Sequence, residues 1–294
     1  MQELVVPAGA ESKNLQNFLK KRFPIGYVRK LFRKNAIRLN GQRAKPDDAA
    51  TAGDLIQLYI PFEAKSGIAP ERHTAKNIPI VYQDASLLVV NKPPGVAVHE
   101  GRSVSRSESL SGLMERIYEQ DKFPPKLAHR LDKHTSGLIL LAKNEQALKE
   151  LESQFAQGKV AKEYLCLVVG HLSRSEGKID LPLPGRDGSL VKAVTRYRVL
   201  RRFAATTLVR VSIETGRLHQ IRLHFARLGY PVVMDDQHGD FAFNKRFRRE
   251  YGLKRQFLHA VKLSVSFAGR RRTWTASLPD DLQKTLAQLE AVRQ

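Results

Sequence analysis

The pattern of apolar and polar positions predicts more strands than helices after residue 78. Apolar or alternating runs predict strands at residues 80–82, 87–90, 138–142, 162–169, 194–201, 206–213 and 257–265. Helical spacing predicts helices at residues 110–118, 144–158 and 218–228, and from residue 279 onward. Because these strands do not alternate regularly with helices, we predict an α+β domain with a mixed or antiparallel sheet.

A smaller unit precedes this domain. Helical spacing predicts two short helices, and the strands that follow are separated by a turn at Asn40 and Gly41. These four elements lie around residues 15–19, 28–32, 37–39 and 54–60. Residues 62–77 show no periodicity, which is typical of a linker. We therefore predict a small domain at residues 1–62, a linker at 63–77 and a larger domain at 78–294.

The charge of the chain is unusual for such a composition. It has 50 Lys and Arg against 29 Asp and Glu, a net charge of +21, and 42% hydrophobic residues. Such an excess indicates a polyanionic partner, most simply a nucleic acid. The single cysteine, Cys166, excludes an internal disulfide framework and lies in an apolar run that predicts an inert buried thiol. We expect no signal peptide, no membrane association and a cytoplasmic location.

Much of this charge lies near the N-terminus. Residues 13–45 contain no acidic residue, so the second predicted helix and the strand after it present a basic face. The residues that we predict to contact RNA phosphates are Arg29, Lys30, Arg33, Lys34 and Arg38. A face that is merely solvated is the alternative. This region also resembles the S4 RNA-binding domain, in residues 15–19, the basic helix, residues 37–41 and residues 53–56.

A carboxylate stands where a polar turn enters an apolar strand. Asp132 lies in the segment of residues 129–144, a few positions before the run from Leu138 to Ala142. A rigid strand is a suitable support for a nucleophile or a base. The alternative is structural, with Asp132 capping the turn and pairing with Arg130 or Lys133. The segment alone leaves both interpretations open.

A second polar cluster occupies residues 216–225. The apolar stripe Leu218, Ile221, Phe225 and Leu228 predicts a helix that places Arg222 beside the stripe rather than opposite it. A guanidinium near a core needs a carboxylate, and Asp132 is one natural partner. Arg222 extending to solvent is an equally good interpretation of the pattern.

Several kinds of chemistry lack their motifs. The chain has no Gly-Lys-Ser phosphate loop and no dinucleotide fingerprint. His219 and His224 are five positions apart, which is wrong for a zinc pair on one helical face. Ser136, His129 and Asp132 lack the context of a nucleophile elbow. What remains is an aspartate that a paired arginine would keep ionised, so that it could act without a metal.

The motifs together resemble the RluA family of pseudouridine synthases, and within it the RluC and RluD type that acts on large-subunit ribosomal RNA. The matching segments follow the family's order and are residues 91–95, 129–137, 162–164, 216–224 and 258–260. The resemblance spans residues 78 to about 262. It implies isomerisation of uridine to pseudouridine in RNA.

The resemblance also implies roles for single residues. Asp132 matches the family's essential aspartate, which acts on uridine as nucleophile or base, and Arg222 matches its basic partner. Tyr164 matches the tyrosine that stacks on the target base, and Leu258 an apolar residue of the base pocket. Arg130 matches the position that fills the gap when the base leaves the helix. From the residues alone, Tyr164 and Leu258 could equally be core residues.

The resemblance implies no cofactor and no metal, and we expect a monomer. Two other functions remain open at this stage, a transfer RNA pseudouridine synthase and a non-catalytic RNA-binding or ribosome-assembly protein. The segments at residues 99–103, 183–188 and 245–255 match the family pattern poorly, so the choice of uridine is less well defined than the reaction. We expect the basic and aromatic residues 245–255 to form a loop that suits an RNA groove. His129 is expected to be structural.

Overall fold

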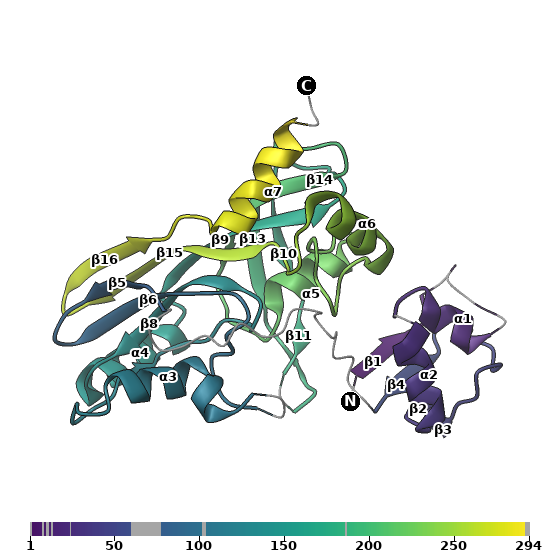
Figure 1. Cartoon of the computed structure of the whole chain (residues 1–294), viewed down its shortest axis with the longest axis horizontal. Coiled ribbons are helices and arrows are strands. Elements are labelled where there is room, and N and C mark those ends of the chain that lie inside the picture. The colour runs from purple at the N-terminus through teal and green to yellow at the C-terminus, as the bar shows by residue number, and fades with distance from the viewer. Residues whose placement is uncertain are drawn as a thin grey trace. The chain divides into compact units, whose positions relative to one another are not determined.

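The computed structural model describes residues 2–59 and 78–291, except residues 8, 10, 11, 13, 24, 102, 103 and 186. The predicted linker at residues 63–77 lies outside the described residues. Two compact units make up the chain, one of Met1–Gly67 with Asp240–Arg246 and one of Ile68–Gly239 with Phe247–Gln294. Each unit is described by itself below (Figure 1).

The N-terminal unit packs two helices on a small antiparallel sheet of order β1-β4-β2-β3. Its elements are β1 (Gln2–Val5), α1 (Leu15–Lys20), α2 (Ile25–Arg33), β2 (Ile37–Leu39), β3 (Gln42–Arg43) and β4 (Leu55–Leu58). Both helices and the strands β2 and β4 agree with those predicted, whereas β1 and β3 were not predicted. Asn40 and Gly41 both have positive φ angles, 51° and 80°, as a tight hairpin turn between β2 and β3 requires. The side chain of Asn14 caps α1 by accepting the N–H of Asn17.

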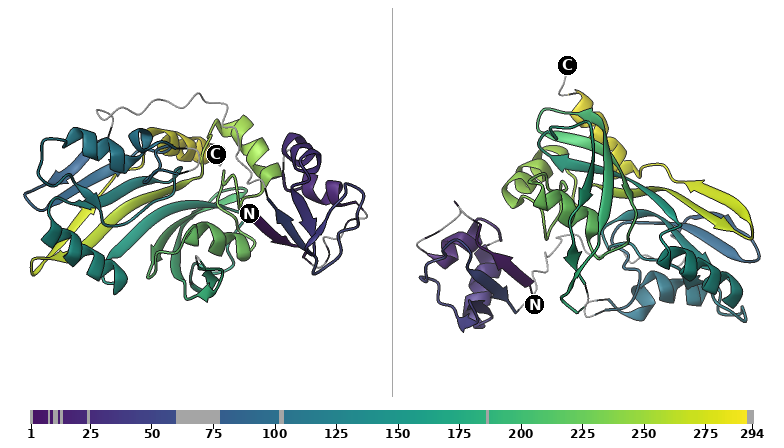
Figure 2. Two further views of the ribbon diagram at one scale, coloured as in Figure 1. Left: turned by 90° about the horizontal axis from the view of Figure 1, so that it is seen from below. Right: turned by 180° about the vertical axis from the view of Figure 1, so that it is seen from behind.

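The larger unit is built on one mixed sheet of order β10-β13-β14-β9-β15-β8-β6-β5 (Figures 1 and 2). The strands are β5 (Ile80–Gln83), β6 (Leu87–Lys92), β7 (Lys126–Leu127), β8 (Ser136–Ala142), β9 (Ala161–Val169), β10 (Glu176–Asp180), β13 (Val194–Arg202), β14 (Thr206–Ile213), β15 (Leu258–Phe267) and β16 (Arg270–Thr275). Strand β7 pairs with β8 and strand β16 with β15. A separate hairpin joins β11 (Leu183–Pro184) to β12 (Leu190–Val191). The mixed α+β architecture is therefore as predicted.

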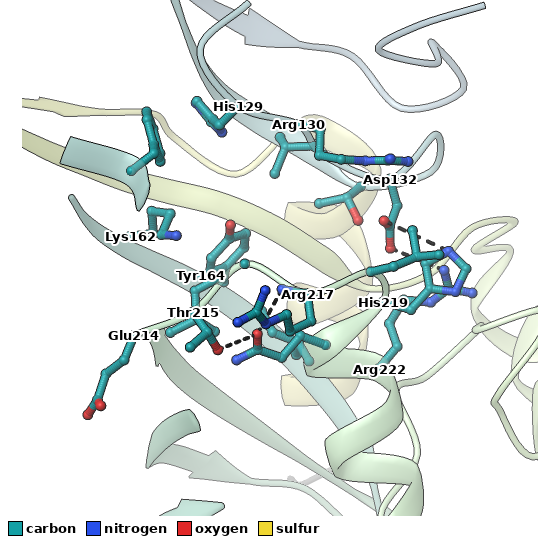
Figure 3. A pocket seen from close by; sticks show the side chains of 18 of the residues that line it. His129, Arg130, Asp132, Lys162, Tyr164, Glu214, Thr215, Arg217, His219 and Arg222 are labelled. Carbon is teal, nitrogen blue, oxygen red and sulfur yellow. Dashed lines mark hydrogen bonds and ion pairs between the residues drawn. The ribbon is translucent and has the colours of Figure 1, made fainter. Parts of the chain in front are cut away.

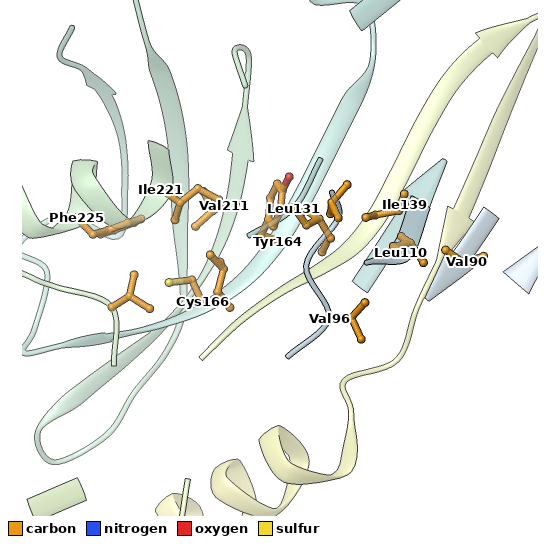
Figure 4. Close-up of a cluster of buried hydrophobic side chains, with 14 of the residues drawn as sticks. Val90, Val96, Leu110, Leu131, Ile139, Tyr164, Cys166, Val211, Ile221 and Phe225 are labelled. Carbon is orange, nitrogen blue, oxygen red and sulfur yellow. The ribbon is translucent and has the colours of Figure 1, made fainter. Parts of the chain in front are cut away.

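Helices cover both faces of the central strands. The described residues from 78 onward form η2 (Arg106–Glu108), α3 (Leu110–Ile117), α4 (Glu145–Ala156), α5 (Gln220–Arg227), α6 (Phe241–Tyr251), whose residues up to Arg246 are grouped with the N-terminal unit, and α7 (Asp280–Ala291). Helices α3 and α5 pack in one hydrophobic cluster (Figure 4), and α4 packs in another. Alternate residues of β8 enter the two clusters, Ile139 the first and Leu140 the second. Burial on both faces explains why this strand is a continuous apolar run.

The only parallel pairing in the larger sheet joins β8 to β15, among the described residues. In it His259 lies opposite Ser136, and Ala260 lies opposite Gly137. Gly137 has a φ angle of +118°, and a Cβ added there would lie 2.3 Å from the carbonyl oxygen of Ala260. The close approach of the two backbones therefore requires a glycine at this position.

Two predictions in the C-terminal third are wrong in part. Residues 245–255 are not a loop, because helix α6 extends to Tyr251 and Phe247 is only 3% exposed. Phe247 and Tyr251 stack four positions apart, at 4.5 Å between ring centroids, and anchor this helix. Helix α5 begins only at Gln220, after a left-handed His219, and Leu218 and Leu228 are 56% and 38% exposed. Its apolar stripe is thus shorter than predicted.

No helix among the described residues is both long enough and apolar enough to cross a membrane.

Replacing Gly137 with alanine should destabilise the larger unit by roughly 3 kcal/mol, since the new Cβ would collide with the backbone of Ala260 at a strained φ angle. Urea denaturation followed by the fluorescence of Trp274, the chain's single tryptophan, reports on this unit. Gly101→Ala is the matched control, because nothing lies within 4 Å of its added Cβ. Equal denaturation midpoints for the two variants would contradict this account.

Candidate functional site

Asp132 lies in a turn that enters strand β8. The backbone of this turn is held from several sides. The N–H of Gly95 donates to the carbonyl of Lys133 at 2.8 Å, and the side chain of Gln256 donates to the hydroxyl of Thr135 at 2.6 Å. The carboxylate itself is 18% exposed, which leaves it accessible from solvent.

A buried lysine also holds the turn. Lys92, at the end of β6, is fully buried, and its Nζ donates to the carbonyls of Pro93, Val96 and Lys133 at 2.9, 2.9 and 3.1 Å. Burial lowers the pKa of Lys92 to about 7. The segment after β6 is thereby tied to the Asp132 turn. Residues 91–95 were predicted only as a segment that matches the RluA family, with no role for Lys92, so this function was missed.

Arg222 is the partner of Asp132. It lies on α5, is 3% exposed, and its Nη1 donates to Oδ2 of Asp132 at 3.1 Å. The predicted pairing is present, and the alternative in which Arg222 extends to solvent is wrong. Oδ1 of Asp132 accepts no hydrogen bond within the described part of the chain, so one carboxylate oxygen is fixed and the other is available.

The stronger partner of Arg222 is Asp235, which sequence reasoning missed. Nε and Nη2 of Arg222 donate to the two carboxylate oxygens of Asp235 at 2.7 and 2.8 Å. Burial raises the pKa of Asp235, but the hydrogen bonds and charge of Arg222 outweigh it and bring this pKa down to about 2. A signal was present, because two consecutive carboxylates follow an apolar run at residues 232–234.

A cavity of about 350 Å³ lies beside the ion pair of Asp132 and Arg222 (Figure 3). It brings together all five residues predicted to act in catalysis or substrate binding, which are Arg130, Asp132, Tyr164, Arg222 and Leu258. Tyr164 on β9 is 5% exposed, and Leu258 at the start of β15 is 3% exposed. Burial and the charge of Asp132 raise the pKa of Tyr164, so its hydroxyl is neutral. The cavity therefore offers a planar group both an aromatic ring and a carboxylate.

Two histidines extend the polar side of the cavity. Nδ1 of His219 lies 3.1 Å from Nε2 of His238, and Nε2 of His219 lies 3.9 Å from Oδ1 of Asp132. Burial lowers the pKa of His219, and burial lowers that of His238 to about 4. Both rings are thus neutral near pH 7. Arg222, not His219, is the cation that balances Asp132.

His129 is structural, as expected. Its Nε2 accepts the backbone N–H of Leu140 at 3.0 Å, and its ring stacks on Phe155 at 4.7 Å. Burial lowers the pKa of His129 to about 3, so the ring is neutral.

Lys162 lines the cavity as well, and burial lowers its pKa to about 8. Arg130 is exposed at the mouth.

The five residues predicted to contact RNA belong to the N-terminal unit. Arg29, Lys30 and Arg33 on α2, Lys34 directly after it and Arg38 on β2 are all exposed. None of them forms an ion pair with a carboxylate among the residues that the structure describes. The absence of such pairs leaves their charge available to a polyanion.

Comparison with known proteins identifies relatives over most of the chain. Residues 86–227 match the family described as RNA pseudouridylate synthase. The ribosomal large subunit pseudouridine synthase C of Vibrio cholerae is 35% identical over 271 residues, covering 85% of this chain and 84% of that protein. The enzyme of the same name from Escherichia coli is 32% identical over 312 residues, covering 99% and 97%.

A solved structure agrees with these relatives. The human protein RNA pseudouridylate synthase domain containing 4 superposes with a TM-score of 0.63 at 26% identity, covering 74% of this chain and 95% of that one. The extent and identity of these matches lead to one conclusion: the chain belongs to the RluA family of pseudouridine synthases.

Proposed function

We propose that this pseudouridine synthase acts on uridines of large-subunit ribosomal RNA and that Asp132 is its catalytic residue. The observation that carries the proposal is the ion pair of Asp132 with a buried Arg222 in a cavity that also holds Tyr164. The substrate class is supported by the names of the relatives from Vibrio cholerae and Escherichia coli. The net charge of +21 fits a polyanionic substrate.

The reaction exchanges one bond for another within the same nucleotide. The N-glycosidic bond between N1 of uracil and the ribose breaks, the detached base turns, and a bond forms from the ribose to C5. A proton leaves C5 and one is taken up at N1, so the reaction needs no oxidant and no hydrolysis. In our proposal Asp132 acts on the nucleotide as nucleophile or general base, and Arg222 holds its carboxylate in place.

The remaining residues of the cavity hold the base. Taking a uridine out of its stack costs a few kcal/mol, and stacking on Tyr164 would return about 1–3 kcal/mol of this. Leu258 supplies an apolar wall. Arg130, exposed at the mouth, would occupy the place that the base leaves in the RNA.

In the same proposal the N-terminal unit, residues 1–62, is an S4-like RNA-binding domain joined by a linker at 63–77 to the catalytic domain at 78–294. Its exposed basic residues on α2 and β2 would contact phosphates without reading sequence. The protein would act as a cytoplasmic monomer without a cofactor.

Mapping the pseudouridines missing from a deletion strain distinguishes this function from its rivals. A transfer RNA enzyme would lose a site in transfer RNA, and a non-catalytic protein would lose none.

Asp132→Asn should abolish product formation, by roughly 10³-fold or more, while RNA affinity stays nearly unchanged. The variant should fold, because Arg222 keeps both of its bonds to Asp235. Chemical mapping of pseudouridine measures activity and filter binding measures affinity. Asp121→Asn, an exposed carboxylate outside the cavity, is the control. Full activity of Asp132→Asn would refute the mechanism.

Tyr164→Phe should keep activity within about tenfold of the wild type, because the ring that stacks on the base remains. Tyr164→Leu should be slower by a further 5- to 150-fold, which corresponds to about 1–3 kcal/mol of stacking. The rates are measured in single turnover on the mapped RNA site. Tyr197→Leu removes a ring that packs against the same hydrophobic cluster outside the cavity, and so controls for general destabilisation. A slower Phe variant than Leu variant would exclude stacking.

Neutralising the basic face of the N-terminal unit should flatten the salt dependence of RNA binding. Each lost phosphate contact should reduce the slope of log affinity against log salt by about 0.7 on single-stranded RNA. The variant replaces five residues with glutamine, namely Arg29, Lys30, Arg33, Lys34 and Arg38.

The control variant removes the same amount of charge from exposed positions of the larger unit, outside its cavity. These positions are Lys122, Lys149, Arg270, Arg271 and Lys284. If neither variant changes the slope of log affinity against log salt, the basic face of the N-terminal unit is only solvated.

A further inference from the structure

A second cavity, of about 300 Å³, adjoins the Asp132 turn. It shares five wall residues with the first cavity, namely Arg130, Leu131, Asp132, His219 and Arg222. Its own walls include residues 97–100 and the pair Asp236 and Gln237. With volumes of about 300 and 350 Å³, each cavity is large enough for a small ligand. Asp132 therefore lies in a wall common to two pockets, of which the reaction uses one.

The orientation of Gln237 in this second pocket is fixed by Arg222. Nη2 of Arg222 donates to the amide oxygen of Gln237 at 3.2 Å. A guanidinium can only donate, so the amide oxygen is the end that faces Arg222 and the NH2 group is directed elsewhere. Within the described parts of the chain, this NH2 group has no acceptor. Gln237 therefore presents a free hydrogen-bond donor.

Asp236 presents acceptors beside this donor. Its Oδ1 lies 3.7 Å from Nη2 of Arg222, which is beyond hydrogen-bond distance, and its side chain is 33% exposed. No hydrogen bond to either oxygen comes from the residues that the structure describes. Both carboxylate oxygens can therefore accept from a ligand. Asp235, its neighbour in the chain, by contrast accepts hydrogen bonds from Arg222 and from the backbone N–H groups of Gln237 and His238.

One donor followed by two acceptors complements one nucleobase. The Watson–Crick edge of guanine offers an acceptor, O6, followed by two donors, N1–H and N2–H2. Uracil offers acceptors on both sides of its single N–H, so one carboxylate oxygen would face O2. Adenine and cytosine each lack the second donor. Charge gives a phosphate no preference here, because the pocket is lined by three carboxylates and three cations, namely Glu100, Asp132, Asp236, Arg130, Lys133 and Arg222.

We propose that this second pocket binds an unstacked guanine next to the target uridine, with Gln237 donating to O6 and Asp236 accepting from N1–H and N2–H2. The inference rests on the proposed function, since it needs an RNA whose uridine lies in the first pocket. Only one phosphate separates neighbouring nucleotides, and the two pockets share a wall. Two neighbouring bases can therefore enter one pocket each. The pocket thus determines which uridines are chosen.

The test uses short RNAs that carry the mapped uridine, with guanosine or inosine at the flanking positions, one side at a time. Inosine lacks only the N2 amino group of guanosine. The wild-type full-length protein should show a kcat/KM about tenfold higher with guanosine than with inosine on one side of the uridine. The mapped uridine should also have a guanosine neighbour.

Asp236→Asn, and more completely Asp236→Ala, should bring this ratio toward one. Asp121→Asn, which is exposed outside both cavities, should keep the ratio of the wild type. A merely structural role of Asp236 would slow both RNAs equally and leave the ratio unchanged, which would overturn the proposal. Equal rates with both RNAs on both sides, or a mapped uridine without a guanosine neighbour, would overturn it too. A wild-type protein that forms no pseudouridine would instead refute the proposed function.

Discussion

The bidentate ion pair between Arg222 and Asp235 is the interaction on which the arrangement of the site depends. A buried guanidinium is costly unless its donors are occupied, and Asp235 occupies two of them with a carboxylate that is itself fully buried. The guanidinium cannot turn without breaking both bonds. Its remaining nitrogen therefore has a fixed position, 3.1 Å from Asp132. In this way helix α5 and the residues after it orient a carboxylate that lies 90 positions earlier in the chain.

A second buried cation fixes the backbone of the same turn. Lys92 gives up its hydration for three carbonyls, and the reduced pKa of about 7 reflects the cost of that exchange. Arg222 restrains the side chain of Asp132, and Lys92 restrains the peptide that follows it. Together they remove the freedom that a turn at a strand end would otherwise have. Such restraint is what a reaction with a freely turning base would require of Asp132 in the proposed catalytic role.

Local patterns in the sequence predicted many of the strands and helices around the site. The run from Leu138 to Ala142 is a buried strand, and Asn144 caps helix α4 by accepting the N–H of Ala147, because both depend on neighbours in the chain. Helix α6 was missed, since its dense charge obscured the aromatic residues Phe243, Phe247 and Tyr251, which recur at every fourth position. Asp235 and Lys92 were missed for another reason. Asp235 meets Arg222 across 13 positions, and Lys92 is buried by the fold and meets Lys133 across 41 positions, which periodicity does not report.

Carboxylates gather around one buried guanidinium in a strongly positive protein. One guanidinium, Arg222, stands among three carboxylates, Asp132, Asp235 and Asp236, while the chain as a whole carries +21. Phosphates are attracted by the protein at a distance and by Arg130 and Lys133 in the cavity wall, but they are repelled by these three carboxylates. A base, which is neutral, is not repelled, and its N–H groups suit carboxylate oxygens. The charge distribution therefore favours an RNA whose backbone stays at the rim while unstacked bases enter the pockets.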